Sequence, residues 1–189
     1  MTKPTDFPLP PDLPRPVDDG ACDHLPGMQM PPVSLPSTAG RMVNLAERTA
    51  SRTVIYCYPR TGVPGEPLPD GWDAIPGARG CTPQSCAFRD HHRELAALGA
   101  DVFGLSTQTT DYQREMAERL HLPFEVLSDA EFTFCEALRL PTFEAAGMRL
   151  IKRLTLVVRD GAIETVFYPV FPPDESADQV LRWLSQNRL

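Results

Sequence analysis

The feature that most constrains the fold is one uncharged run of β-branched and aromatic residues. Thr53-Val54-Ile55-Tyr56-Cys57-Tyr58 carries no charge, and Pro59 ends it. Successive side chains of a strand point to opposite faces, so a run without charged residues suits a strand that is covered on both faces. The run therefore predicts a buried central strand in a sheet with packing layers on both sides.

Around this strand, helix and strand patterns alternate along the chain. The capping sequence Thr82-Pro83 predicts a helix to about Leu98, and Ser128-x-x-Glu131 predicts the start of a later one. The expected elements are a hairpin at 32–45, strands at 53–58, 101–105 and 124–127, helices at 82–98 and from 110, 128 and 176, and a hairpin at 151–168. This alternation predicts an α/β fold with a mostly parallel sheet, helices on both faces and antiparallel strands added by the last hairpin.

The first thirty residues differ from the rest in composition. Ten of the 21 prolines lie in the first 36 residues, and residues 1–30 show no hydrophobic period. We predict an extended, partly disordered arm over residues 1–30 and a folded domain over 31–189. The arm has two interpretations, a tail that wraps the surface or a docking segment for a partner.

Composition excludes several classes of protein. The net charge of −7 argues against a nucleic-acid surface and against binding to an anionic membrane. No apolar run approaches the ~18 residues of a transmembrane helix, and no basic stretch followed by an apolar one marks a signal peptide. We therefore expect a cytoplasmic protein, in a reducing compartment where its five cysteines are too few and odd in number for a disulfide scaffold.

Cys81 is the candidate nucleophile. It stands just before the cap of the helix expected after the central strand, where unpaired N–H groups and the helix dipole favour a thiolate over a thiol. Arg79 adds positive charge beside it if the side chain points that way.

The remaining cysteines have more than one interpretation. Cys86 lies five residues after Cys81, and helix geometry would place their Cα atoms roughly 8–9 Å apart, whereas a disulfide needs about 7 Å or less. A bond between them would require the first helical turn to unwind; alternatively, Cys86 is a buried apolar residue. We expect Cys57 and Cys135 in the core and Cys22 in the arm, open to oxidation. No second ligand pair at zinc spacing is present, so no metal is expected.

Several motifs in order carry a family resemblance. The stretch from Cys81 to Asp90, with Glu94-Leu95 and Leu98-Gly99-Ala100, resembles peroxiredoxins of the bacterioferritin-comigratory or PrxQ type. Further segments resemble motifs of the same family: Tyr58-Pro59, Val102 to Ser106, Leu122-Pro123-Phe124, Leu127-Ser128-Asp129, and Arg153 to Val158 with Asp160-Gly161. The resemblance covers about residues 32–170. It implies a thioredoxin-like fold with a central mixed β-sheet and thiol-dependent reduction of hydrogen peroxide or organic hydroperoxides.

The resemblance also implies roles for particular residues. Cys81 would be the peroxidatic cysteine, Cys86 the resolving cysteine, and Arg153 the group that stabilises the thiolate and the transition state. Gln84 stands where some members of the family have a Glu or Gln that hydrogen-bonds this arginine, and we place it with the substrate-binding residues. The implied reductant is thioredoxin, glutaredoxin or a small thiol, acting on a monomer or homodimer without a bound cofactor.

One departure from the family pattern affects the substrate. Three residues before Cys81 the family has a threonine or serine hydroxyl, and this chain has Ala78. A Gly- and Pro-rich insertion separates Pro59 from Cys81, so Thr61 is the candidate for the displaced hydroxyl, and Trp72 for a residue that shapes access. Peroxide preference stays open.

Two other functions are kept as alternatives. A thiol–disulfide oxidoreductase of the same fold would ignore peroxide, although no C-x-x-C motif is present. A redox sensor would signal by unwinding the helix at Cys81 onto a partner, with the proline-rich arm as the route of contact.

Overall fold

The computed structural model describes residues 7–49 and 51–188, and its centre is a five-stranded sheet. The strand order is β5 (Glu125–Ser128), β4 (Ala100–Ser106), β3 (Arg52–Cys57), β8 (Leu154–Arg159) and β9 (Ala162–Phe167). The predicted uncharged strand is confirmed as the middle strand β3, buried along its length. β3 pairs in parallel with β4 and antiparallel with β8, so the sheet is mixed rather than mostly parallel. The last hairpin, β8–β9, joins the sheet beside the central strand, so two of the four strand pairs are antiparallel.

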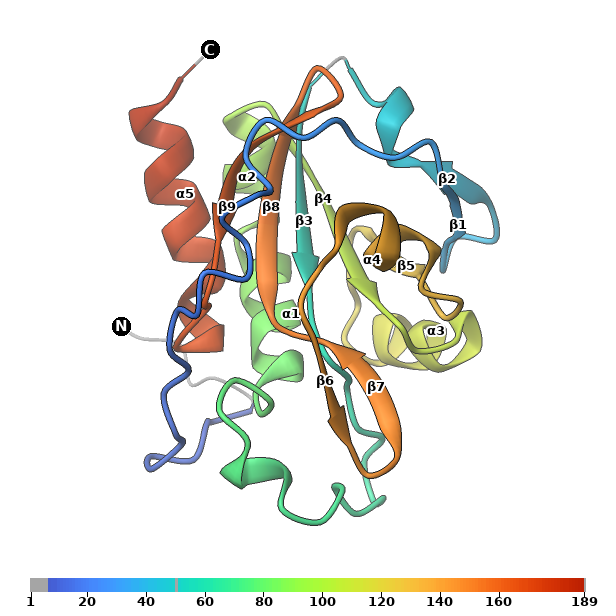
Figure 1. Ribbon diagram of the computed structural model, residues 1–189, viewed down its shortest axis with the longest axis vertical. Helices are drawn as coiled ribbons and strands as arrows, with labels where there is room; N and C mark the ends of the chain where they lie inside the picture. The colour runs from blue at the N-terminus through green and yellow to red at the C-terminus, as the bar shows by residue number, and fades with distance from the viewer. Residues whose placement is uncertain (1–6, 50, 189) are drawn as a thin grey trace.

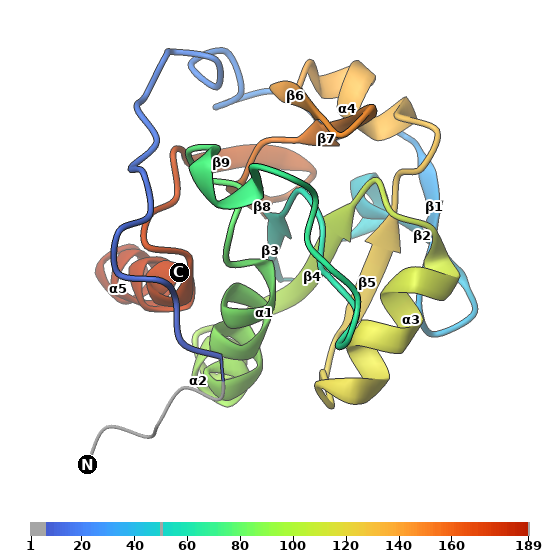
Figure 2. The same cartoon turned by 90° about the horizontal axis from the view of Figure 1, so that it is seen from below.

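Two layers cover the sheet (Figures 1 and 2). One face carries α1 (Cys81–Asp90), α2 (His92–Ala97), α3 (Thr110–Arg119) and α5 (Ser176–Gln186). The other carries α4 (Thr133–Leu138) and the hairpins β1 (Ser34–Pro36)–β2 (Met42–Asn44) and β6 (Thr142–Ala145)–β7 (Met148–Ile151). Short 3-10 turns are η1 (Leu45–Glu47), η2 (Trp72–Ala74) and η3 (Pro173–Glu175). The predicted hairpins at 32–45 and 151–168 are confirmed, and β6–β7 was not predicted.

The single helix predicted over 82–98 is wrong in one respect. The chain leaves helical geometry at His91 (φ −98°, ψ 7°), and α2 begins at the next residue. The apolar stripe continues across the break, because Phe88 and Leu95 are both buried in the same core. Periodicity therefore predicted the buried face correctly and could not register a one-residue break.

Aromatic packing fixes α1 against the central strand. The rings of Tyr56 on β3 and Phe88 on α1 stack with centroids 4.5 Å apart and an interplanar angle of 9°. The Tyr56 hydroxyl donates to Ser85 Oγ at 3.0 Å. Gly104, paired with Tyr56 across the sheet, leaves room for this ring, since a Cβ there would lie 2.8 Å from the hydroxyl. The start of α1, with Cys81, is therefore held firmly at the end of β3.

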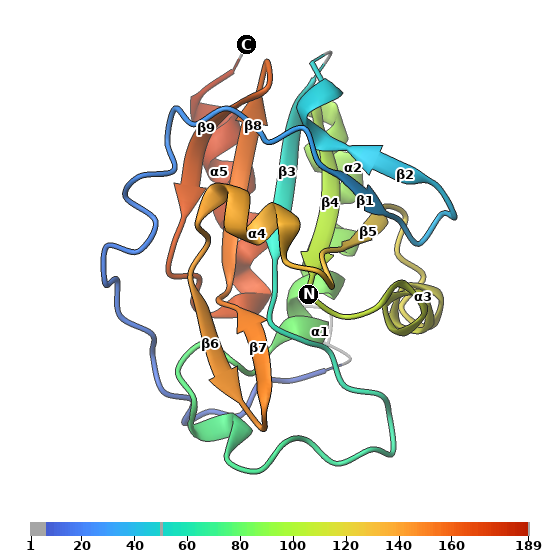
Figure 3. The same cartoon turned by 45° about the vertical axis from the view of Figure 1, so that its right-hand side comes forward.

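The proline-rich arm wraps the domain from residue 7 onward, running first beside the loop over 59–80 and then outside β9 (Figures 1 and 3). Its later part enters the core with Cys22, Leu25 and Met30. The Met30 N–H donates to Gly161 O at 2.7 Å, which ties the arm to the hairpin end of β9. Wrapping is thus the interpretation that residues 7–30 fit. The division at residue 30 stays a prediction, and residues 1–6 lie outside the described residues.

Candidate active site

Cys81 is the first residue of α1, and its backbone surroundings explain its position. Gly80 precedes it with φ +110°, a left-handed conformation that favours glycine. A Cβ at Gly80 would lie 2.7 Å from Pro173 Cγ, so glycine is also needed for space. No side chain caps the helix, which leaves the N–H groups of its first turn free of a side-chain acceptor. The predicted cap at Thr82 is wrong, because Gly80 occupies the N-cap position and Cys81 opens the helix. The helix dipole at this end favours negative charge.

Arg153 lies just before β8 and points its guanidinium at Cys81. Its Nη2 donates to Cys81 Sγ at 3.2 Å, and also to the carbonyls of Ala78 at 3.0 Å and Arg79 at 3.2 Å. The side chain is 4% exposed. Among the described residues, no carboxylate lies within salt-bridge distance of it. A buried cation without an acidic partner is costly, and a thiolate at Cys81 is the anion placed to compensate it.

Gln84 supports Arg153 from within α1. Its Oε1 accepts a hydrogen bond from Arg153 Nη1, and its Nε2 donates to Ser176 Oγ at 3.2 Å. These bonds include the expected contact with the arginine. Gln84 is fully buried and does not line the pocket at Cys81, so its place among the substrate-binding residues stays a prediction. Ser176, which completes this chain of bonds from α5, was expected only as a helix cap, and its distance in sequence gave no signal of this contact.

A pocket of about 280 Å³ opens onto Cys81, and it contains the displaced hydroxyl candidate. Thr61 lines the pocket together with Cys81, and its Oγ1 donates to Gln108 Oε1 at 3.3 Å. Ala78 is buried and contributes a carbonyl to Arg153 in place of a hydroxyl. Trp72 of the inserted loop forms part of the wall. The insertion thus brings Thr61 to the same cavity as a cysteine twenty residues later.

Two neighbours of Cys81 take different positions. Arg79 pairs with Asp73 at 2.7 Å, so its charge is engaged by a carboxylate instead of being directed at the thiol. Cys86 lies farther along α1, half-buried, and does not line the pocket at Cys81. Neither Cys81 nor Cys86 forms a disulfide in this structure, where α1 is intact.

The other three cysteines gather in the core on the opposite face of the sheet. Cys57 and Cys135 are buried there as expected, and so is Cys22, so the expectation that Cys22 is open to oxidation is wrong. Burial raises the pKa of Cys22 to about 12 and that of Cys135 to about 11. Burial also raises the pKa of the Cys57 thiol. These thiols therefore stay protonated and inert at neutral pH.

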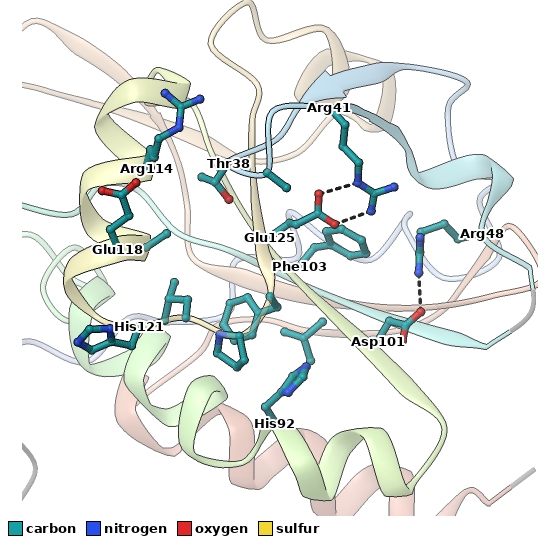
Figure 4. A pocket seen from close by; sticks show the side chains of 16 residues that line it. Thr38, Arg41, Arg48, His92, Asp101, Phe103, Arg114, Glu118, His121 and Glu125 are labelled. Atoms are coloured by element: carbon teal, nitrogen blue, oxygen red, sulfur yellow. Dashed lines mark hydrogen bonds and ion pairs between the residues drawn. The ribbon is translucent and has the colours of Figure 1, made fainter.

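A larger cavity of about 700 Å³ lies elsewhere, between α2, α3 and the strands β4 and β5 (Figure 4). Its lining contains no thiol and shares no residue with the Cys81 pocket. Two of its arginines are paired with carboxylates, Arg41 with Glu125 and Arg48 with Asp101, both at 2.5 Å. Size alone would favour this cavity, but the chemistry that the sequence predicts is located in the smaller one.

The described residues contain no group of three or more His, Cys, Asp or Glu side chains placed to hold a metal ion. None of their helices combines the length and the apolar character that crossing a bilayer requires.

The chain is similar to known proteins over most of its length. The redoxin family model matches residues 25–181. The chain is 32% identical over 161 residues to peroxiredoxin Bcp of Escherichia coli, covering 83% of this chain and 93% of the relative. It is 27% identical to the chloroplastic peroxiredoxin Q of Sedum lineare, covering 84% and 76%.

A solved structure gives the same result for the fold. The peroxidoxin BcpB of Mycobacterium tuberculosis superposes with a TM-score of 0.71 at 26% identity, covering 88% of this chain and all of the other. The thioredoxin-like fold with a central mixed sheet is thereby confirmed. The chain belongs to the redoxin family, and within it to the Bcp and PrxQ group of peroxiredoxins, which are thiol-dependent peroxidases.

Proposed function

We propose that this peroxiredoxin uses Cys81 as the peroxidatic and Cys86 as the resolving cysteine. The observation that carries the proposal is the contact between Arg153 and Cys81. A buried guanidinium that lacks a carboxylate partner among the described residues, and donates to Sγ at 3.2 Å, favours the anionic sulfur. The start of α1 adds the helix dipole to the same atom.

The first step is a displacement at oxygen. The Cys81 thiolate attacks the terminal oxygen of hydrogen peroxide or an organic hydroperoxide, an S–O bond forms and the O–O bond breaks. The leaving oxygen takes a proton and departs as water or an alcohol, and Cys81 becomes a sulfenic acid. Arg153 stabilises the negative charge that develops on the peroxide oxygens, and the Thr61 hydroxyl hydrogen-bonds the peroxide from the pocket wall.

The second step requires α1 to change. The Cys86 thiol condenses with the sulfenic acid, forming a disulfide and releasing water. Five helical positions place the Cα atoms of Cys81 and Cys86 roughly 8–9 Å apart, whereas a disulfide needs about 7 Å or less, so the first turn of α1 must unwind. Unwinding breaks the bonds of Gln84 to Arg153 and Ser176. Two electrons from thioredoxin, glutaredoxin or a small thiol then restore both thiols.

The location and assembly that go with this function are also proposals. A reducing cytoplasm would supply the thiol reductant and return the five cysteines to the reduced state between turnovers. A monomer or homodimer suffices, because both proposed cysteines belong to one chain.

Two cysteine substitutions test the assignment of the nucleophile. Cys81→Ala should abolish consumption of hydrogen peroxide with dithiothreitol as reductant. Cys57→Ala, which removes an equally buried thiol from the other face of the sheet, should retain turnover. Equal loss in both variants, or turnover by Cys81→Ala, would reject the assignment.

A mass map tests the resolving cysteine. One equivalent of peroxide should produce a peptide pair linked through Cys81 and Cys86 in the wild type. In Cys86→Ser the same treatment should leave Cys81 one oxygen heavier, and excess peroxide should add further oxygens. A disulfide that joins Cys81 to another cysteine would contradict the proposed pairing. Oxidation without sustained turnover would favour the redox-sensor alternative.

A further inference from the structure

The first described residues of the arm lie at the pocket that opens onto Cys81. Phe7, Pro8 and Leu9 line it, although some seventy residues separate them from the cysteine. A Cβ at Gly80 would lie 3.0 Å from Leu9 Cδ2, so the Leu9 side chain packs against the residue that precedes Cys81. The arm is therefore a structural part of the site.

The arm is fastened on the side of the molecule where this pocket opens. Arg15 places its guanidinium carbon 4.9 Å from the centre of the Phe171 ring. Asp19 accepts hydrogen bonds from the Tyr168 hydroxyl at 2.8 Å and from Lys152 Nζ at 3.1 Å. These contacts come shortly after Leu9 in the chain and limit how far the segment over 7–9 can move from the pocket.

The pocket mouth includes exposed apolar side chains. Four large hydrophobic side chains are exposed among the described residues, and two of them line this pocket, Phe7 at 37% and Leu68 at 40%. Leu68 belongs to the inserted loop and Phe7 to the arm, so two unrelated segments present apolar surface to one cavity. Hydrogen peroxide has no apolar atoms and gains nothing from such walls, whereas the organic group of an alkyl or aryl hydroperoxide does.

We propose that Phe7 and Leu9 are specificity-determining residues, which bind the organic group of a hydroperoxide against Leu68 while its O–O bond faces Cys81. This inference rests on the proposed function and adds the substrate class that the site prefers. The residues lie before the segment that matches the redoxin family, which begins at residue 25. Selectivity would therefore be supplied by a part of the chain outside the matched family region.

Steady-state kinetics with two substrates test this inference. The double variant Phe7→Ala/Leu9→Ala should raise KM for cumene hydroperoxide about tenfold, the usual scale for losing apolar contacts in a pocket. Its kcat/KM for hydrogen peroxide should stay within about twofold of the wild type. Val17→Ala is the matched control, since Val17 is an apolar arm residue, 80% exposed, that does not line the Cys81 pocket.

A variant on the opposite wall guards against an effect of the arm on folding. Leu68→Ala leaves the arm sequence intact and should raise KM for cumene hydroperoxide in the same selective way. An unchanged KM in both variants, or an equal loss for both substrates, would overturn the inference. If the wild type reduces neither hydrogen peroxide nor cumene hydroperoxide, the proposed function fails, a result distinct from loss of selectivity.

Discussion

The guanidinium of Arg153 donates to the sulfur of Cys81 over 3.2 Å, at a site where neither side chain is more than 4% exposed. Gln84 Oε1 and the backbone carbonyls of residues 77–79 accept its other hydrogen bonds, and these neutral groups orient the cation without neutralising it. In a poorly solvated site, this leaves the sulfur as the group on which negative charge is most stabilised. We therefore predict that the reactivity of Cys81 depends on Arg153 more than on any other side chain described.

Removing this cation should slow the first step strongly. Arg153→Met keeps the length and apolar stem of the side chain and removes the charge. We expect kcat/KM for hydrogen peroxide to fall about 100- to 1000-fold, as for loss of one preorganised donor to a developing anion. Stopped-flow peroxide consumption measures it, and the rate of Cys81 alkylation by iodoacetamide should fall in parallel.

The matched control for that variant is Arg79→Met. Arg79 is closer to Cys81 in sequence, but its charge is paired with Asp73. Its rates should stay within about threefold of the wild type, because a partly exposed ion pair contributes little. A larger effect from Arg79 than from Arg153 would contradict the assigned electrostatics.

Thiol labelling should separate the cysteines into two groups. In the folded protein at pH 8, iodoacetamide should label Cys81 and Cys86. Cys22, Cys57 and Cys135 should stay unlabelled, because burial raises the pKa of each of these thiols. In denaturant all five should react. Peptide mass spectrometry checks the result, and rapid labelling of Cys22 in the folded state would show that the arm does not pack as described.

The central strand and the helix start were predictable because their signals are local. An uncharged β-branched run identified β3, and Thr82-Pro83 predicted a helix close to where α1 begins, although Gly80 rather than Thr82 is its N-cap. Capping was no more exact at α4: Ser128-x-x-Glu131 predicted a helix start, yet α4 begins at Thr133. There the carboxylate of Asp129, inside the same motif, accepts from the N–H groups of Phe134 and Cys135 instead. Capping motifs thus located the helix but not its first residue.

The site was predictable only where a motif carried it. Cys81 was singled out by its place at a helix start and Arg153 by a family resemblance, and the structure places them in contact. Phe7 and Leu9 line the pocket because a folded arm returns to it, and no periodicity or spacing in a proline-rich stretch encodes such a return. Ser176, a partner of Gln84, is likewise brought in by the packing of α5 against α1. Long-range contacts of this kind depend on the whole fold.

Gly80 should tolerate a side chain poorly, for two separable reasons. Its φ of +110° strains any residue with a Cβ, and that Cβ would lie 2.7 Å from Pro173. Gly65 shares the first reason alone, with φ +87° and open space around its Cβ position. Gly65→Ala should therefore cost about 1 kcal/mol of unfolding free energy, and Gly80→Ala about 1–3 kcal/mol more. Urea denaturation measures both losses in unfolding free energy. Equal losses would mean that the structure accommodates the contact with Pro173 at no free-energy cost.

Acid should loosen the arm through Asp19. Hydrogen bonds from Tyr168 and then Lys152 lower the pKa of Asp19 from about 3.8 to about 2. A carboxylate whose pKa is lower in the folded state stabilises the fold fully above the unfolded pKa, and loses this contribution as the pH falls from about 4 toward 2. Asp19→Asn should therefore lower the unfolding temperature at pH 7, and the difference from the wild type should shrink toward zero at pH 2.

The matched control is Asp12→Asn, which alters an exposed carboxylate of the same arm. It should leave the unfolding temperature at pH 7 within about 1 °C of the wild type. A difference between Asp19→Asn and the wild type that persists unchanged at pH 2 would show that the charge of Asp19 does not anchor the arm.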